Sequence, residues 1–263
     1  MKSKKSAIVI VCLMALAFIL WLLYLGPIAQ NPEYHKFADI RCMGGLCRAG
    51  DVLTNIPFII VGAWGLLYLY SAKSESAFEN KFEKKYFVIF YIGLFLTGFG
   101  SSYYHVDPSS STLFWDRLPL TLSFMSFLCI TISERISPSF AEKIFIPTLL
   151  LGLFSVVYWH FTEQAGVGDL RFYYFVQFFT IFIIPIILIL FKSRYKFGHY
   201  VWYIMAAYFG AKVTEIYDHE IYNAIKVLSG HNLKHLIAAL SPVFILIMLK
   251  KRQVEKPSTE IMI

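Results

Sequence analysis

The chain has 263 residues, of which 57% are hydrophobic and only 16% are charged, and its mean hydropathy is +0.60. A soluble domain carries about 25% charged residues, so this composition excludes an ordinary soluble protein and indicates a membrane protein. The formal net charge of +7 does not indicate nucleic-acid binding, because the lysines and arginines lie at the ends of apolar segments rather than in one patch.

Eight apolar segments follow one another along the chain, and each is long enough to cross a hydrocarbon core of about 30 Å as a helix. They are 7–26, 52–71, 86–105, 117–133, 143–160, 172–191, 199–217 and 231–249. The first segment has the alternative of a cleaved signal peptide. Its apolar core is long for a signal, and Gly26-Pro27 is a poor cleavage site, so we favour a retained anchor helix. The predicted fold is therefore all-α, a polytopic seven-transmembrane-helix bundle with one extra N-terminal helix.

The predicted spans divide the chain into four parts. They are a cytoplasmic tip and anchor helix (1–30), an extracytoplasmic loop (31–51), a seven-helix core (52–250) and a cytoplasmic tail (251–263). With the N-terminus in the cytoplasm, every cytoplasmic segment is basic and most of the 24 lysines and arginines lie on that side. The positive-inside rule therefore predicts that both termini are cytoplasmic.

Polar residues interrupt the apolar pattern near one membrane face. Ser101 and His105 lie four residues apart at the end of the third segment, so they share a helix face. Asp116 precedes the fourth segment, where Pro119 suits the first turn of a helix and places Asp116 at its start. The alternation of the spans places these residues at one depth on the extracytoplasmic side. Ionisable groups at membrane depth are costly and mark function by default.

A histidine pair completes this group at the same depth. His231 and His235, again four residues apart, begin the last segment. Three imidazoles with an open position form a common catalytic zinc site. In such a site Asp116 would act as general base toward a metal-bound water or orient a ligand, and Ser101 would hydrogen-bond a developing oxyanion. Each residue alone has a simpler explanation, as an interfacial histidine, a chance spacing or a packing serine, but their conjunction at one depth favours a metal site.

The residues around these positions resemble the alkaline ceramidase family, within a superfamily of seven-helix membrane hydrolases that includes the progestin and adiponectin receptors. The resemblance covers roughly residues 38 to 249, and the bacterial branch is the most similar. The segments that carry it read DVLTNIPFIIVG, GFGSSYYHVDPSSSTLFWDRLPLT and GHNLKHLIAAL.

The resemblance implies a zinc-dependent amidohydrolase that acts on linear, non-peptide carbon–nitrogen bonds. Zn²⁺ would be held by His105, His231 and His235, with Asp116 activating water and Ser101 holding the carbonyl. The substrate would be ceramide or a related N-acyl lipid of the bilayer, cleaved to a fatty acid and a free amine. The site would face away from the cytoplasm, in a bacterial cytoplasmic (inner) membrane. The alternative is a metal-containing receptor or membrane-stress protein with little turnover, and a transporter without metal is a third hypothesis.

The polar loop before the core departs from the eukaryotic members, which build a calcium site there from an Asp-Trp-Cys-Glu-x-Asn segment and a nearby Glu. Only Asp39 and Asp51 remain here as Ca²⁺ ligands, and this leaves too few oxygen donors for a strong calcium site. Cys42 and Cys47 in the same loop form a disulfide in an oxidising compartment or remain free thiols, and the sequence leaves both alternatives open.

Glu215 and Asp218 follow near the outer end of the seventh segment. The sequence allows two roles for them. They are either hydrogen-bond partners of a ligating histidine or ordinary loop acids.

Overall fold

The structure, a computed structural model, describes residues 4–254. It is almost entirely helical. In chain order, its helices and strands are α1 (Lys4–Leu25), η1 (Pro32–His35), β1 (Cys42–Met43), β2 (Leu46–Cys47), α2 (Ala49–Leu53), α3 (Ile56–Tyr70), η2 (Ala72–Ala77), α4 (Lys81–Val106), α5 (Ser110–Arg135), α6 (Pro138–Gln164), α7 (Arg171–Tyr174), η3 (Phe175–Phe179), α8 (Thr180–Leu190), α9 (Tyr200–Ile216), α10 (Asp218–Ile225), α11 (Gly230–Ala238) and α12 (Leu240–Lys251).

Seven helical segments within the described residues are long and apolar enough to cross a membrane. They are Ile8–Leu25, Ala49–Tyr70, Lys81–Val106, Ser110–Arg135, Pro138–Gln164, Arg171–Leu190 and Gly230–Lys251. The remaining predicted segment, 199–217, forms the 17-residue helix α9, which packs against α11 and α12 inside the bundle. The prediction of an all-α, polytopic membrane protein is thus confirmed.

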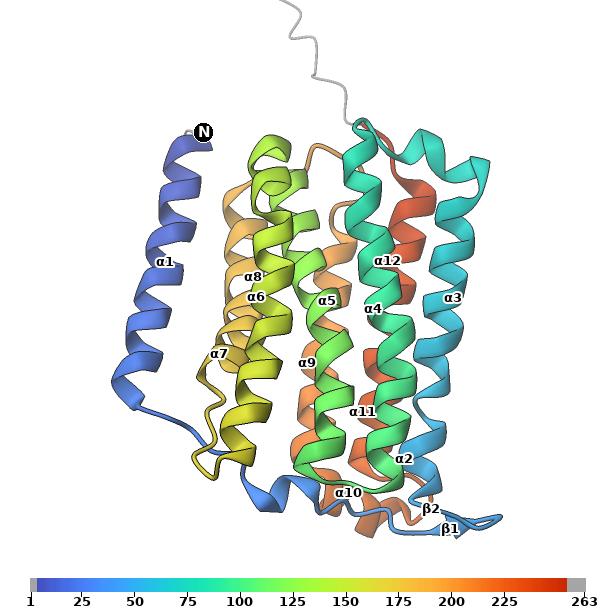
Figure 1. The fold of residues 1–263 in the computed structure, drawn as a ribbon. Coiled ribbons are helices and arrows are strands. Elements are labelled where there is room, and N and C mark those ends of the chain that lie inside the picture. The colour runs from blue at the N-terminus through green and yellow to red at the C-terminus, as the bar shows by residue number, and fades with distance from the viewer. Residues whose placement is uncertain (1–3, 255–263) are drawn as a thin grey trace, which may run out of the picture.

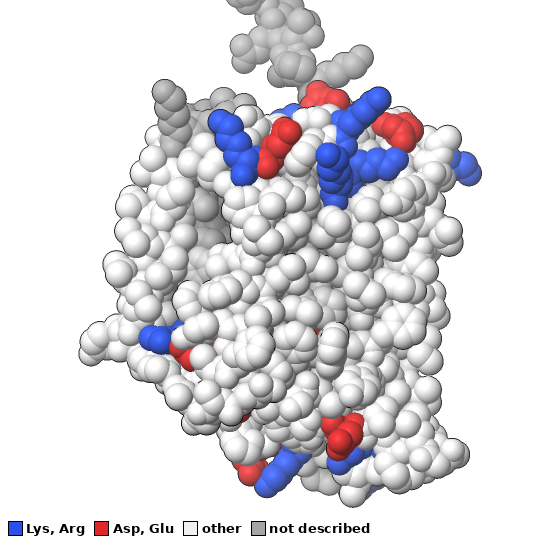
Figure 2. All heavy atoms as spheres, in the orientation of Figure 1, with Lys and Arg blue, Asp and Glu red and all other residues white. Residues whose placement is uncertain are grey.

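The helices form one bundle in which α4 packs against α3 and α5, and α5 packs against α6 (Figure 1). Helix α1 stands at the edge of this bundle, where Phe18 contacts the ring of Phe175 at 6.0 Å between centroids. Charged side chains gather mostly near the two ends of the visible face, and uncharged atoms cover the middle (Figure 2). This distribution suits a protein whose central belt faces hydrocarbon.

Helix α5 begins earlier than the sequence suggested. The side chain of Ser109 accepts a hydrogen bond from the Thr112 amide, and the Thr112 side chain accepts one from the Ser109 amide. This capping box starts the helix at Ser110, because it satisfies amides that have no partner within the helix. The expectation that Asp116 lies at the helix start is therefore wrong. Asp116 lies in the second turn, and Pro119 is inside the helix.

At the end opposite the polar loop, a buried network of ionic side chains ties helix ends together. Arg252, only 5% exposed, places Nη2 3.1 Å from Glu83 and Nη1 3.2 Å from Glu134. Its guanidinium also lies 3.6 Å from the ring centroid of Tyr195. Arg252 belongs to the predicted tail 251–263, but it is packed inside the protein. The rest of that predicted tail, from residue 255 onward, lies outside the described residues.

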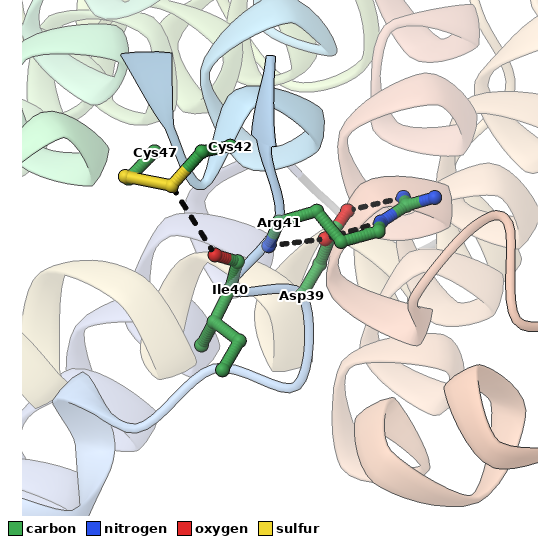
Figure 3. Close-up of a disulfide and its surroundings, with 5 residues drawn as sticks. All are labelled: Asp39, Ile40, Arg41, Cys42 and Cys47. Atoms are coloured by element: carbon green, nitrogen blue, oxygen red, sulfur yellow. Dashed lines mark hydrogen bonds and ion pairs between the residues drawn. A yellow bond between two sulfur atoms is a disulfide. The ribbon is translucent and has the colours of Figure 1, made fainter. Parts of the chain in front are cut away.

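The loop between α1 and α2 crosses the end of the bundle that also carries α10 (Figure 1). Its short hairpin pairs Cys42 with Cys47 and turns through Gly44 and Gly45, whose φ angles of 57° and 85° favour glycine. Of the two alternatives for these cysteines, the structure contains the disulfide (Figure 3). The disulfide closes the hairpin directly after Arg41, which pairs with Asp39.

Candidate metal centre and adjoining cavity

The three predicted metal ligands meet in the interior of the bundle. His105 lies in the last turn of α4, and His231 and His235 lie one turn apart on α11. Each is at most 3% exposed, and one nitrogen atom from each lies within 4.8 Å of the other two. Nε2 of His231 is 3.2 Å from Nε2 of His105. The arrangement could hold a metal ion.

Hydrogen bonds around Thr54 determine which ring nitrogen of His235 carries the hydrogen. The Thr54 hydroxyl donates to the Gly50 carbonyl at 2.8 Å and lies 2.9 Å from Nδ1 of His235. Because its own proton is used on Gly50, the hydroxyl accepts a hydrogen bond from the Nδ1–H of His235, and Nε2 of His235 keeps a free lone pair. This support is typical of metal-ligating histidines. No sequence pattern marked Thr54 as part of the site, since a threonine between two apolar runs is common in membrane helices.

One ring nitrogen of His105 is buried without a hydrogen bond to any described residue. This atom is Nδ1. A buried nitrogen in this state is costly, because it has lost its water without gaining a partner. The other ring nitrogen, Nε2, faces Nε2 of His231 and is the atom placed to bind an ion.

The loop before α2 covers the histidines. The ring of Phe37 lies 4.7 Å from the ring of His105 and 4.4 Å from that of His231. Asp218 accepts hydrogen bonds from the Ala38 amide at 2.9 Å and from the His231 amide at 2.7 Å. Asp218 therefore contacts the backbone amide of His231, a predicted ligand, and not the His231 ring. The contact of Phe37 with the two histidine rings was not predicted from the sequence.

Ser101 and Asp116 come together from adjacent helices. Ser101 lies one turn before His105 on α4 and is 3% exposed, and its side chain is a hydrogen-bond partner of the Asp116 carboxyl on α5. The two helices touch closely beside this pair, since a Cβ on Gly100 would lie 2.0 Å from the carbonyl oxygen of Trp115. All five residues predicted for the site thus lie at one end of the bundle.

Replacing Gly100 by alanine is expected to destabilise the protein by about 1–3 kcal/mol, the usual cost of overpacking. The added methyl group meets a backbone oxygen that cannot rotate away, so α4 and α5 must separate. Thermal unfolding of the purified protein in detergent would measure the loss. Gly210→Ala is the matched control, because its Cβ would come no closer than 3.6 Å to Ile237. Equal unfolding temperatures for the two variants would contradict the close approach.

A cavity of about 470 Å³ adjoins the predicted site. Ser101, Asp116 and His235 are among its lining residues. Much of the wall is apolar, and it includes Phe90, Leu94, Phe127, Ile184 and Ile245. The polar part of the lining includes Tyr34, Arg117, Lys212, Glu215 and Lys234. The cavity therefore combines a large apolar wall with a charged part beside the predicted site.

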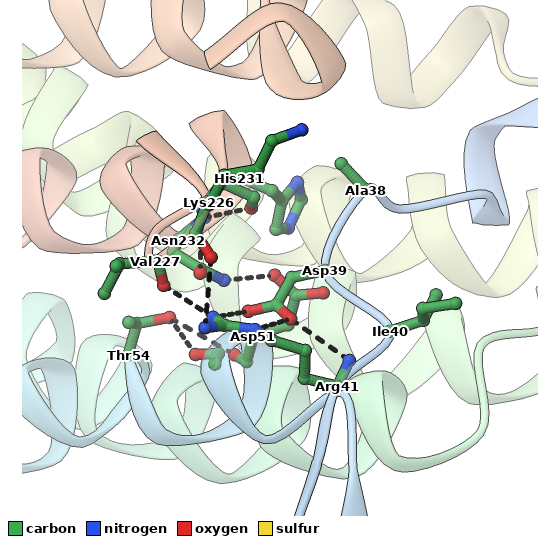
Figure 4. A network of polar contacts seen from close by, with 12 residues as sticks. Ala38, Asp39, Ile40, Arg41, Asp51, Thr54, Lys226, Val227, His231 and Asn232 are labelled. Atoms are coloured by element: carbon green, nitrogen blue, oxygen red, sulfur yellow. Dashed lines mark hydrogen bonds and ion pairs between the residues drawn. The ribbon is translucent and has the colours of Figure 1, made fainter. Parts of the chain in front are cut away.

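The two carboxylates considered for calcium are both fully buried, but each has a partner (Figure 4). Arg41 donates from Nε and Nη2 to the two oxygens of Asp39 at 2.8 and 2.7 Å. Burial raises the pKa of Asp39, but the hydrogen bonds from Arg41 outweigh it and the net pKa is lowered. Asn232 donates to Asp51 at 2.6 Å. A Ca²⁺ ion beside Asp39 would have to displace a cation already present, and calcium binding remains an untested prediction.

The bundle and its buried histidines define a multi-pass membrane protein with a cluster that could hold a metal ion. A family model described as Ceramidase matches residues 49–260, and the chain belongs to this family. It is accordingly an amidohydrolase of non-peptide carbon–nitrogen bonds that acts on ceramide-like lipids. No curated protein and no solved structure matches the chain significantly.

Proposed function

We propose that the protein is a zinc-dependent intramembrane hydrolase that cleaves the amide bond of ceramide or a related N-acyl lipid, giving a fatty acid and a free amine. The observation that carries this proposal is the meeting of three buried histidines beside a largely apolar cavity. Tetrahedral zinc with bonds of about 2.0–2.1 Å to nitrogen places its ligand atoms about 3.3 Å apart. The 3.2 Å between His105 Nε2 and His231 Nε2 agrees with that spacing.

The zinc ligands are His105, His231 and His235, and bound zinc would supply Lewis-acid polarisation of the amide carbonyl and activation of a water molecule. Asp116 takes a proton from the attacking water and returns it to the leaving amine nitrogen as the carbon–nitrogen bond breaks. The Ser101 hydroxyl donates a hydrogen bond to the carbonyl oxygen as it gains charge. The apolar wall of the cavity holds the acyl chain and excludes water around it.

We infer that the site lies on the extracytoplasmic side of a bacterial inner membrane and that both termini are cytoplasmic. The beginning of α1 and the end of α12 lie at the same end of the bundle, and α4 ends at His105 at the other (Figure 1). The basic residues Lys250 and Lys251 follow the last apolar stretch, as the positive-inside rule expects of a cytoplasmic end.

The proposal is tested with purified protein, Zn²⁺ and N-acyl lipids in mixed micelles. Release of fatty acid from ceramide or another N-acyl lipid is expected, together with about one zinc per chain by elemental analysis. Bound zinc without fatty acid release from any N-acyl lipid would favour the receptor or membrane-stress alternative. Absence of both zinc and turnover would contradict the proposal and favour a transporter.

A further inference from the structure

Arg117 is a buried cation that has no hydrogen-bond or ion-pair partner in the part of the chain that the structure describes. The residue is 5% exposed, and its Nη1 is fully buried without a hydrogen bond. A guanidinium removed from water is costly unless an opposite charge or an acceptor compensates it. Because the side chain also lines the cavity, that compensation can come from a molecule bound there.

Aromatic rings hold the guanidinium in place. It lies 4.5 Å from the ring centroid of Trp159, 4.7 Å from that of Tyr173 and 5.4 Å from that of Tyr34. Cation–π contacts offset part of the cost of burial but use none of the N–H donors. The rings therefore orient a planar group whose donors remain available, and this is the geometry that binds a carboxylate or a phosphate through two parallel hydrogen bonds.

Two lysines add to the positive charge in the charged part of the cavity. Lys212 and Lys234 both pair with one carboxylate, that of Glu215, and Lys234 does so at 2.6 Å. The charged side chains that line the cavity are three cations and two carboxylates. One of these carboxylates is Asp116, which the proposed chemistry uses. The charged part of the cavity therefore carries an excess of positive charge, which favours an anionic ligand.

The position of Arg117, Lys212 and Lys234 in the cavity indicates which part of a bound lipid they contact. Ser101, Asp116 and His235 define the place of the amide, and the apolar wall receives the acyl chain. The amine portion of the substrate then occupies the charged part of the cavity, where Arg117 follows Asp116 on α5 and contacts the ring of Tyr34 in the loop.

We propose that Arg117, assisted by Lys212 and Lys234, binds an anionic oxygen group on the amine portion of the substrate. The inference rests on the proposed amide hydrolysis and narrows its substrate class to acidic N-acyl lipids, whose amine carries a carboxylate or a phosphate. Arg117 is then the residue that favours lipids with an anionic amine portion over the corresponding neutral N-acyl lipids.

Three lipids with one acyl chain test the proposal: N-palmitoylglycine, N-palmitoyl-phosphoethanolamine and the neutral N-palmitoylethanolamine. At least one anionic lipid is expected to exceed the neutral one in kcat/KM by about tenfold or more, as suits a charge-assisted hydrogen bond. Arg117→Gln is expected to reduce this ratio at least about tenfold, mainly through KM, and Arg117→Lys by less, because lysine keeps the charge but loses the planar fork. The better anionic lipid identifies the group as carboxylate or phosphate.

Lys36→Gln is the control, because Lys36 lies on the loop that carries Tyr34 and, among residues 4–254, its ammonium pairs only with the exposed Glu33. It is expected to keep the wild-type ratio. A wild-type preference for the neutral lipid would overturn the proposal whatever the variants do. An unchanged ratio of anionic to neutral kcat/KM in folded Arg117→Gln would also overturn it. If Arg117→Gln does not fold, the wild-type ratio and the ratio in Arg117→Lys are compared instead, and equal ratios in these two proteins would overturn the proposal.

Binding separates a failure of this inference from a failure of the proposed function. If none of the three lipids is hydrolysed, the amidase proposal fails, and the affinities of the same lipids are measured by quenching of tryptophan fluorescence. Tighter binding of an anionic lipid by the wild type, lost in Arg117→Gln, supports the anionic subsite. Equal affinities for anionic and neutral lipids overturn it.

Discussion

Replacing His105 by alanine is expected to abolish zinc binding and to lower amide hydrolysis by at least about a thousandfold. Metal-ion catalysis supplies several kcal/mol of transition-state stabilisation, and each 1.4 kcal/mol corresponds to about tenfold in rate. The variant loses one of three ligands that lie within 4.8 Å of one another, and the two histidines left on α11 do not complete the site. Elemental analysis and fatty-acid release from the same preparation measure both losses.

His219→Ala is the control for this prediction. His219 is exposed on α10, at the same end of the bundle, and its ring only approaches the Lys36 carbonyl at 3.4 Å. The control is expected to retain zinc and activity. An active, zinc-loaded His105→Ala protein would remove this histidine from the metal site and with it the proposed mechanism.

Asp116→Asn is expected to lower kcat by about 10²–10⁴-fold, the usual contribution of a general acid–base group, while zinc remains bound. The amide keeps the shape of the carboxylate and its contact with Ser101, but it cannot accept the proton of the attacking water. Because the acyl chain still binds the apolar wall, KM is expected to change little. Steady-state kinetics and zinc content of the same protein test this separation.

Asp107→Asn provides the matched control, since Asp107 follows α4 in the turn before α5 and its side chain is exposed. It should behave like the wild type. Loss of zinc in Asp116→Asn would instead assign Asp116 a structural role at the metal site. Unchanged kcat would exclude it as the group that moves the proton.

The order and approximate positions of the long apolar helices followed from the sequence, because hydrocarbon thickness sets a minimum length for every span. The meeting of His105 with His231 and His235 followed from the same alternation, because it assigns each helix end to one face of the membrane. The start of α5 did not follow, since a capping box at Ser109 is a local polar signal that a hydropathy window passes over. The position of Asp116 within its helix was mistaken for this reason.

The contacts that complete the site could not be read from the sequence. Thr54 reaches His235 across 181 positions of the chain, and Arg117 meets its three aromatic neighbours from three other elements. Such contacts leave no periodic pattern, because they depend on how helices pack rather than on how each is composed. The choice between a disulfide and free thiols at Cys42 and Cys47 likewise depended on the hairpin register.

The two hydrogen bonds that Asp218 accepts connect the loop before α2 to the start of α11, where His231 lies. The family match starts at residue 49, yet two residues before it contact this region. Phe37 packs on the rings of His105 and His231, and the Ala38 amide donates a hydrogen bond to Asp218. A chain cut at residue 49 would uncover His105 and leave one oxygen of Asp218 without its donor. The segment that links α1 to α2 therefore covers the buried histidines, although it lies before the residues that match the family.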